Sequence, residues 1–184
     1  RDPAHAAAVV AAMTKAVKIP VTVKMRAGWD ERDRNAPTLA RMVEDAGAAA
    51  VAVHGRTAEQ SYSGLADWDF IVSIAEALTI PVFGSGDCVE PEQIVDRLRT
   101  GVAGVLVGRG VLRNPWILAQ AADLAAGRPP RGVTLADRGR FLLDYINLLL
   151  EEHDAEAAGF RHQAGAAAAP ARGRERWVVN KVRA

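Results

Sequence analysis

The chain has 184 residues, of which 49% are hydrophobic and 24% are charged, and its formal net charge is +1. This length and hydrophobic content predict one domain, or one domain and part of a second, while the small net charge excludes a strong overall field for nucleic acid. The single cysteine, Cys88, excludes an internal disulfide, and no apolar run reaches transmembrane length. Without a signal peptide at the start, we expect a cytoplasmic protein.

Helix-like and strand-like stretches alternate along the first two thirds of the sequence. Asp2 and Pro3 form an N-cap and a first helical turn, and short apolar runs that end in polar residues predict strands. The expected helices cover residues 4–17, 36–46, 67–78, 90–98 and 115–125, and the expected strands cover residues 21–25, 50–54, 80–85 and 102–107.

Four strand–helix repeats predict an α/β fold with a parallel sheet and right-handed crossovers. An open doubly wound sheet and a (β/α)8 barrel both satisfy this pattern. The barrel is favoured because the last two strands end in glycine-rich turns, GSGD and GRG, where barrels place phosphate sites after strands seven and eight. We therefore expect the C-terminal half of a TIM barrel. The chain starts with Arg1 and both ends fall inside apparent helices, so we expect a fragment.

The strand–helix repeat of the sequence ends at Gly127, and a different residue pattern follows. We expect residues 1–127 to form the barrel half and residues 128–184 to begin a helical domain, in which Thr134 caps a long helix to about His153. Residues 159–174 read as a loop and residues 177–182 as another helix. The last 30 residues carry six basic and two acidic side chains, which fit either a polyanion site or a solvated helix face.

Two glycine-rich turns are candidates for a phosphate site. Gly84 and Gly86 surround one turn, and Gly108 and Gly110 surround the other, where Arg109 adds a fork-shaped cation. Backbone amides that approach closely at such turns bind phosphate. Glycines that only form turns are the alternative, but two such turns after successive strands favour a phosphate site.

Three side chains at strand ends are further candidates. Lys24 lies in an apolar strand, where an ammonium needs a partner, either a ligand or a neighbouring carboxylate. His54 and Arg56 are two residues apart, so strand alternation would place them on one side, where they could hold an anion or a base edge. A histidine bonded to a backbone carbonyl is the alternative.

Two residues at the GSGD turn have competing roles. Asp87 could accept a hydrogen bond from a ligand hydroxyl or cap a helix that starts near Val89. Cys88 lacks a neighbouring base, so we expect it to be structural. No cluster with the spacing of metal ligands and no Ser/His/Asp arrangement is present, so we expect no metal.

Four segments, VKMR, VHGRTAEQSYSGLADW, PVFGSGD and GVLVGRGVLRNPW, resemble the tRNA-dihydrouridine synthase family in this order. The resemblance extends from about Asp2 to the end of the chain, and the block from His54 to Trp68 is specific among flavin barrels. The closing stretch RWVVNKVRA resembles the helical tRNA-binding domain of one bacterial branch.

The resemblance implies an FMN-bound TIM barrel that reduces uridine in tRNA to 5,6-dihydrouridine, with NADPH as the reductant. It implies that Arg56 faces the uracil or a nearby phosphate, and that Ser85 replaces a usual asparagine. The cysteine that donates a proton belongs to a motif upstream of Arg1, so no catalytic residue is expected in this chain, which alone would be inactive. The FMN-binding residues that the resemblance implies are Lys24, His54, Ser85, Gly86, Asp87, Gly108 and Arg109.

Two other readings stay open at this point. Another FMN- or phosphate-binding barrel, similar to dihydroorotate dehydrogenase, would account for Lys24 and the glycine turns but not for the block from His54 to Trp68. A non-catalytic RNA-binding fragment would account for the basic end of the chain.

Overall fold

The computed structural model describes residues 2–164, and within its last helix it describes side chains only as far as Glu152. The chain divides into two compact units, Arg1–Arg131 and Gly132–Ala184. The division falls four residues after the predicted boundary, at Arg131 instead of Gly127. The reason is Asp123, whose carboxylate binds the side chains of Arg128 and Arg131 and ties the linker to the first unit.

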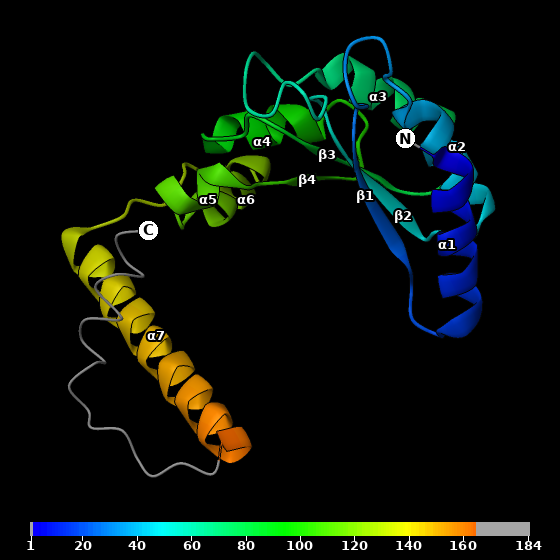
Figure 1. Ribbon diagram of the computed structural model, residues 1–184. Helices are drawn as coiled ribbons and strands as arrows, with labels where there is room; N and C mark the ends of the chain where they lie inside the picture. The colour runs from blue at the N-terminus through cyan, green and yellow to red at the C-terminus, as the bar shows by residue number, and fades with distance from the viewer. Residues whose placement is uncertain (1, 165–184) are drawn as a thin grey trace. The chain divides into compact units, whose positions relative to one another are not determined.

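Four parallel strands form one sheet in the order of the sequence, β1-β2-β3-β4 (Figure 1). They are β1 (Thr22–Arg26), β2 (Ala50–His54), β3 (Val82–Ser85) and β4 (Gly104–Leu106). A doubly wound sheet reverses its strand order at a switch point, whereas successive neighbours without reversal are the pattern of a (β/α)8 barrel. The predicted α/β class and barrel architecture are therefore confirmed for this part of a TIM barrel.

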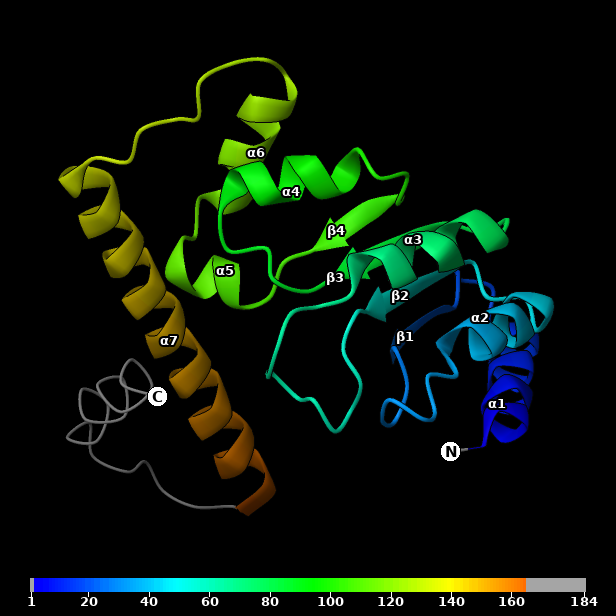
Figure 2. The same cartoon turned by 90° about the horizontal axis from the view of Figure 1, so that it is seen from above.

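The described part of the first unit contains six helices, and Figure 2 shows α2, α3 and α4 beside the strands that they connect. Five helices were predicted to within two residues at either end, while the short α5 was not predicted. The prediction that Asp87 caps the next helix is wrong, because α4 begins later, with Glu90 as its N-cap. The helices are α1 (Pro3–Ala16), α2 (Ala36–Asp45), α3 (Trp68–Ala77), α4 (Pro91–Leu98), α5 (Arg109–Arg113) and α6 (Ile117–Ala125).

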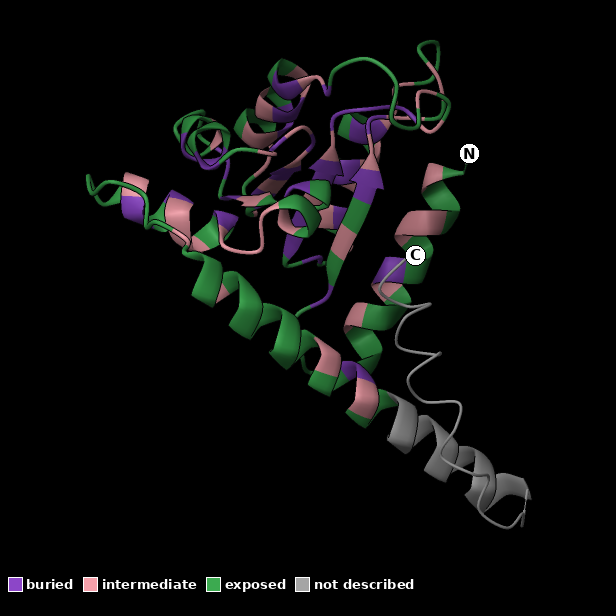
Figure 3. Ribbon diagram, turned by 90° about the vertical axis from the view of Figure 1, so that its left-hand side faces the viewer, coloured by how far each residue is buried: buried purple, intermediate pink, exposed green. Residues whose placement is uncertain are grey.

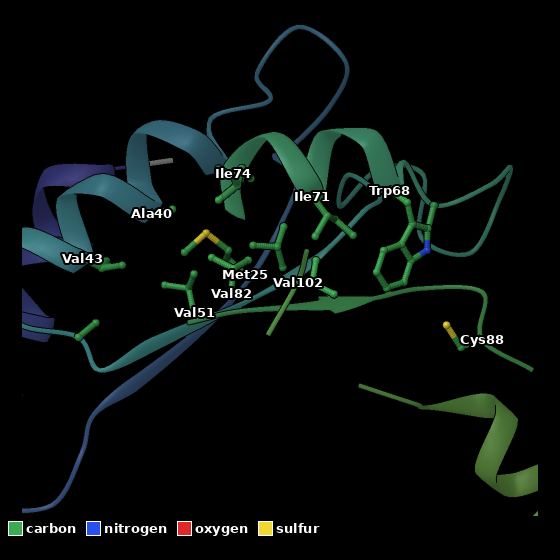
Figure 4. Close-up of a cluster of buried hydrophobic side chains, with 14 of the residues drawn as sticks. Met25, Ala40, Val43, Val51, Trp68, Ile71, Ile74, Val82, Cys88 and Val102 are labelled. Carbon is green, nitrogen blue, oxygen red and sulfur yellow. The ribbon is translucent and has the colours of Figure 1, made fainter. Parts of the chain in front are cut away.

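The two faces of the sheet have different surroundings. Parallel register aligns Met25 with Val53 and Val53 with Gly84, and this face belongs to the hydrophobic core. Figure 4 shows Ile71 and Ile74 of α3 among the core side chains. Burial of this kind stabilises the fold by about 1.5–3 kcal/mol for each large aliphatic side chain.

The opposite face of the sheet carries the polar strand ends. The register aligns Arg26 with His54 and His54 with Ser85. Lys24 lies on the same face, two residues before Arg26, and it is exposed, so the buried lysine that the apolar strand suggested is not observed. The alternation of the strands thus separates the hydrophobic core from the candidate site.

The second unit is described through a single helix, α7 (Leu135–Ala164). Thr134 and Asp137 exchange hydrogen bonds at its start, which confirms the predicted cap. The helix continues beyond the predicted end at His153, so residues 159–164 of the predicted loop are helical; the three alanines within residues 155–158, just before them, favour a helix. The rest of that loop and the predicted helix at residues 177–182 lie outside the described residues.

Most described side chains of α7 are exposed, as Figure 3 shows. None of the helices described has both the length and the hydrophobicity that a membrane span requires.

Candidate functional site

A cavity of about 470 Å³ lies at the carboxyl ends of the four strands, within the first unit. The parallel sheet produces this arrangement because all of its strand ends meet at one edge. All seven residues predicted to bind a cofactor line the cavity. They are Lys24, His54, Ser85, Gly86, Asp87, Gly108 and Arg109.

His54 lies at the end of β2, next to Ser85 on β3. Its Nδ1 is 3.3 Å from the Ser85 hydroxyl oxygen, and its buried Nε2 has no partner among the described residues. Burial and then the positive charges of Arg26 and Arg56 lower the pKa of His54 below its usual value. The ring is therefore neutral at neutral pH, and its Nε2 can form one hydrogen bond with a ligand in the cavity.

The turn after β3 has an unusual backbone. Gly86 has φ +136° and Asp87 has φ +53°, a left-handed conformation that few residues other than glycine adopt. The indole nitrogen of Trp68 donates a 3.0 Å hydrogen bond to the Gly86 carbonyl. A Cβ on Gly86 would come within 2.3 Å of the Ala66 side chain, so only glycine fits between the turn and its neighbour.

Asp87 is held by two donors. The backbone N–H of Ala66 donates to one carboxylate oxygen at 2.6 Å, and Arg56 donates to both oxygens. Burial opposes ionisation of this carboxyl, but the hydrogen bonds from Ala66 and Arg56 outweigh it, and the pKa of Asp87 is lowered. Asp87 is thus a fixed anion at the rim of the cavity.

Arg109 and Gly108 form the other side of the cavity. The Arg109 side chain is 55% exposed, with its Nη2 3.7 Å from an Asp87 oxygen and its guanidinium 4.6 Å from the centre of the Tyr62 ring. Apart from its chain neighbours, no atom of the described residues lies within 4 Å of where a Cβ on Gly108 would be, so the backbone there is open to a ligand. The exposed ammonium of Lys24 lines the same cavity from β1, so the cavity carries positive charge that can receive an anion.

Arg56 is in a different position from the one expected. Only 2% of its side chain is exposed, and it does not line the cavity. It donates hydrogen bonds to the carbonyls of Ser63 and Gly64 and to Asp87. Burial outside the cavity lining does not support the expected contact with uracil or a phosphate, and two of the three guanidinium nitrogens, Nε and Nη2, already donate to the protein.

Two other residues singled out in the sequence, Gly84 and Cys88, pack against the interior of the protein. Gly84 lies on the core face, where a Cβ would come within 2.2 Å of the Trp68 ring, so it does not approach a ligand. Cys88 lines the cavity but is 5% exposed, and burial raises the pKa of its thiol to about 11. Within the part of the chain that the structure describes, no group of His, Cys, Asp or Glu side chains could hold a metal ion.

Among the cavity residues that were not predicted as candidates, two have polar side chains, Arg26 and Tyr62. Arg26 lines the cavity and donates hydrogen bonds to the carbonyls of Thr57 and Ser61, and Tyr62 lies beneath Arg109. The position of Arg26, two residues after Lys24 on the same strand, is a signal that could have identified it. Tyr62 lies in a loop without periodicity, and nothing in the sequence pattern indicates its direction.

A family model, Dihydrouridine synthase, matches residues 1–175 of this chain. The chain belongs to the dihydrouridine synthase family. It is 50% identical to a probable tRNA-dihydrouridine synthase of Rickettsia bellii over 161 residues, which are 86% of this chain and 49% of that protein. A probable tRNA-dihydrouridine synthase of Rickettsia prowazekii is 43% identical over 82% of this chain and 47% of its own length. The chain therefore spans about half the length of these curated relatives.

Solved structures support the fold. A mandelate oxidase variant crystallised with benzoyl-formic acid superimposes with a TM-score of 0.52, over 66% of this chain and 38% of that one, at 22% identity. At this identity the likeness concerns only the fold.

Proposed function

We propose that this chain supplies the FMN site and a tRNA-contacting part of a tRNA-dihydrouridine synthase, which reduces uridine in tRNA to 5,6-dihydrouridine with NADPH as the reductant. The observation that carries the proposal is the cavity at the strand ends, where seven residues implied by the family resemblance meet in a chain of that family. A cytoplasmic location follows from the substrate, since tRNA is modified there.

The residues present fit FMN on three counts. The buried Nε2 of His54 has no partner among residues 2–164, as expected of a group that bonds a ligand. The open backbone at Gly108 leaves space for an anion. Arg109 and Lys24 supply positive charge at the same cavity, which suits a phosphate and an electron-rich ring.

Each group of residues has a task in this proposal. Gly108 and Arg109 bind the phosphate, and the turn Ser85–Asp87 binds the ribityl hydroxyls. Lys24 and His54 contact the ring system, where His54 donates or accepts a single hydrogen bond because it is neutral. When bound, FMN supplies the hydride that reduces the pyrimidine ring.

The acid that completes the reduction is not assigned to this chain. Cys88 is its only cysteine, and a buried thiol with a pKa of about 11 is neither exposed to a tRNA base nor poised to transfer a proton at neutral pH. We therefore propose that the 184 residues alone form no dihydrouridine, and that the proton donor lies outside them.

The test compares the 184-residue chain with the intact gene product that carries it. Flavin absorbance after purification measures cofactor retention, and dihydrouridine in unmodified tRNA measures turnover with NADPH. We expect the intact protein to retain flavin and to form dihydrouridine. We expect no dihydrouridine from the 184-residue chain. An intact protein that retains no FMN would refute the cofactor proposal, and dihydrouridine formed by the short chain would refute its inactivity. Flavin reoxidation by quinones but not by tRNA would indicate a different flavoenzyme.

A further inference from the structure

One buried guanidinium connects three segments that surround the cavity. Arg56 follows strand β2, and its Nε donates to the Ser63 carbonyl at 3.1 Å. Its Nη2 donates to the Gly64 carbonyl at 2.6 Å and to the two oxygens of Asp87 at 2.6 and 2.8 Å. The end of β2, the loop of residues 61–66 and the turn after β3 are therefore joined through one side chain.

The turn that Arg56 holds has a backbone that needs support. Asp87 has φ +53° and follows Gly86 at φ +136°. A left-handed residue other than glycine persists only where its surroundings fix it. Here Arg56 and the N–H of Ala66 fix the Asp87 carboxylate from the side of the 61–66 loop. Without the guanidinium, the carboxylate would keep only the Ala66 donor and the more distant Arg109.

The same geometry argues against direct recognition of a ligand by Arg56. The side chain is 2% exposed and does not line the cavity, although its neighbours His54 and Asp87 do. The remaining nitrogen, Nη1, is buried as well and has no partner among the described residues. Unlike the unpartnered Nε2 of His54, this nitrogen belongs to a side chain that does not line the cavity, and both other nitrogens of the guanidinium donate to the protein.

We propose that Arg56 is a positioning residue, which holds the Ser85–Asp87 turn and the 61–66 loop in the form that binds the cofactor, and that it contacts neither cofactor nor substrate. This inference rests on the proposed FMN site. It predicts that loss of Arg56 lowers the fraction of protein with a competent turn, which weakens FMN binding in proportion.

The first test measures FMN affinity of the intact protein by fluorescence quenching. Arg34→Met is the matched control, because Arg34 also pairs with an aspartate, Asp67, at 2.7 Å but lies outside the cavity lining. We expect Arg56→Met to raise the Kd for FMN at least about tenfold and Arg34→Met to change it less than about twofold. An unchanged Kd for FMN combined with weaker tRNA binding would overturn the proposal and assign Arg56 to the substrate.

The second test needs no cofactor. Amide hydrogen exchange in the FMN-free protein reports opening of residues 61–66 and 85–88. We expect Arg56→Met to accelerate exchange in both segments together, by about 100-fold, because the half-buried Asp87 carboxylate and the carbonyls of Ser63 and Gly64 then lose the buried guanidinium that joins them. Arg34→Met should leave both segments as in the wild type. Acceleration spread evenly over the first unit would overturn a positioning role.

The two tests separate the inference from the proposed function. Wild-type protein that binds no FMN would refute the proposed function, while the exchange pattern would still decide whether Arg56 positions the turn. If Arg56→Met yields no soluble protein, Arg56→Lys serves in both tests. A lysine keeps the charge but has a single ammonium, which cannot reach Asp87 and both carbonyls as the guanidinium does, so the same direction of change is expected.

Discussion

The indole Nε1 of Trp68 donates a 3.0 Å hydrogen bond to the backbone carbonyl of Gly86. The same indole ring lies against Gly84, two residues earlier, where a Cβ would come within 2.2 Å of a ring carbon. One side chain of α3 therefore packs against strand β3 and also supports the turn that follows it (Figure 4). The shape of the candidate FMN site consequently depends on packing in the core.

Substitution of Gly84 by alanine should damage both the core and the site. The added methyl group would displace the Trp68 ring, and overpacking of this kind costs about 1–3 kcal/mol of unfolding free energy. Urea unfolding measures this loss, and FMN affinity should fall with it. Gly132→Ala is the control, because no described residue other than its chain neighbours lies within 4 Å of its Cβ position. Equal stability of Gly84→Ala and Gly132→Ala would contradict the packing argument.

His54 should titrate below its usual pKa of 6.5. Burial is the main cause, and the positive charge of Arg26 is the next. Proton-detected NMR of the ring Cε1–H measures the midpoint. Arg26→Met should raise the pKa because it removes one positive neighbour, and Arg32→Met, an exposed position on the adjacent loop, should leave it unchanged. A midpoint at or above 6.5 in the wild type would contradict the described environment.

The lowered pKa of His54 also fixes the sign of its effect on stability. The unfolded chain binds a proton at a higher pH than the folded protein does. Stability therefore falls as the pH drops below 6.5, until the folded histidine is protonated too. His54→Gln should lose less stability than the wild type over this window.

The sequence was sufficient to predict the elements and the edge at which the site lies, but not every side-chain direction. Apolar runs and helix caps predicted the ends of all four strands to within two residues of those observed. In the sheet, the parallel register places His54 beside Ser85. The alternation of side chains along a strand did not predict the direction of Arg56. Strand β2 ends at His54, so strand geometry no longer sets the direction of the residues that follow. Its partner Asp87 is 31 residues away, and no local pattern indicates that pair.

The thiol of Cys88 should be unreactive in the folded protein. Burial raises its pKa to about 11, compared with an ordinary value of 9.0. At pH 8 the thiolate fraction, and with it the alkylation rate, should be about 100-fold below that of an unhindered cysteine. Mass spectrometry after iodoacetamide treatment measures this rate, with urea-unfolded protein as the control. Rapid alkylation of the native protein would contradict a structural role for Cys88.

Ionisation of Glu44 should make the stability of the folded protein depend on pH in the acid range. Its carboxylate accepts hydrogen bonds from the hydroxyl and N–H of Thr79 and from the N–H of Ile80, and the Thr79 hydroxyl is the main cause of a pKa lowered from 4.5 to about 2. The stabilisation is present above pH 4.5 and is lost as the pH falls toward 2. The Tm difference between wild type and Glu44→Gln should therefore narrow over this window. A constant difference would contradict the prediction.

Asp123 should control access to the linker between the two units. Its carboxylate, in a residue that is 5% exposed, accepts hydrogen bonds from the side chains of Arg128 and Arg131 and from the N–H of Arg131. Trypsin must open this segment to cleave after Arg131, so the cleavage rate reports how firmly Asp123 holds it. Asp123→Asn should accelerate this cleavage about tenfold, since the amide forms weaker bonds with guanidinium groups than a carboxylate does.

A matched variant separates this effect from loss of an ordinary ion pair. Asp96 pairs with Arg99 at 3.2 Å, but both side chains are about 70% exposed, and such pairs contribute little. Asp96→Asn should therefore leave cleavage after Arg131 unchanged. If both variants cleave at the wild-type rate, Asp123 does not hold the linker, and the boundary of the first unit lies closer to Gly127, where the sequence alone places it. If only Asp123→Asn is cleaved faster, residues 128–131 belong to the first unit because one buried carboxylate binds them.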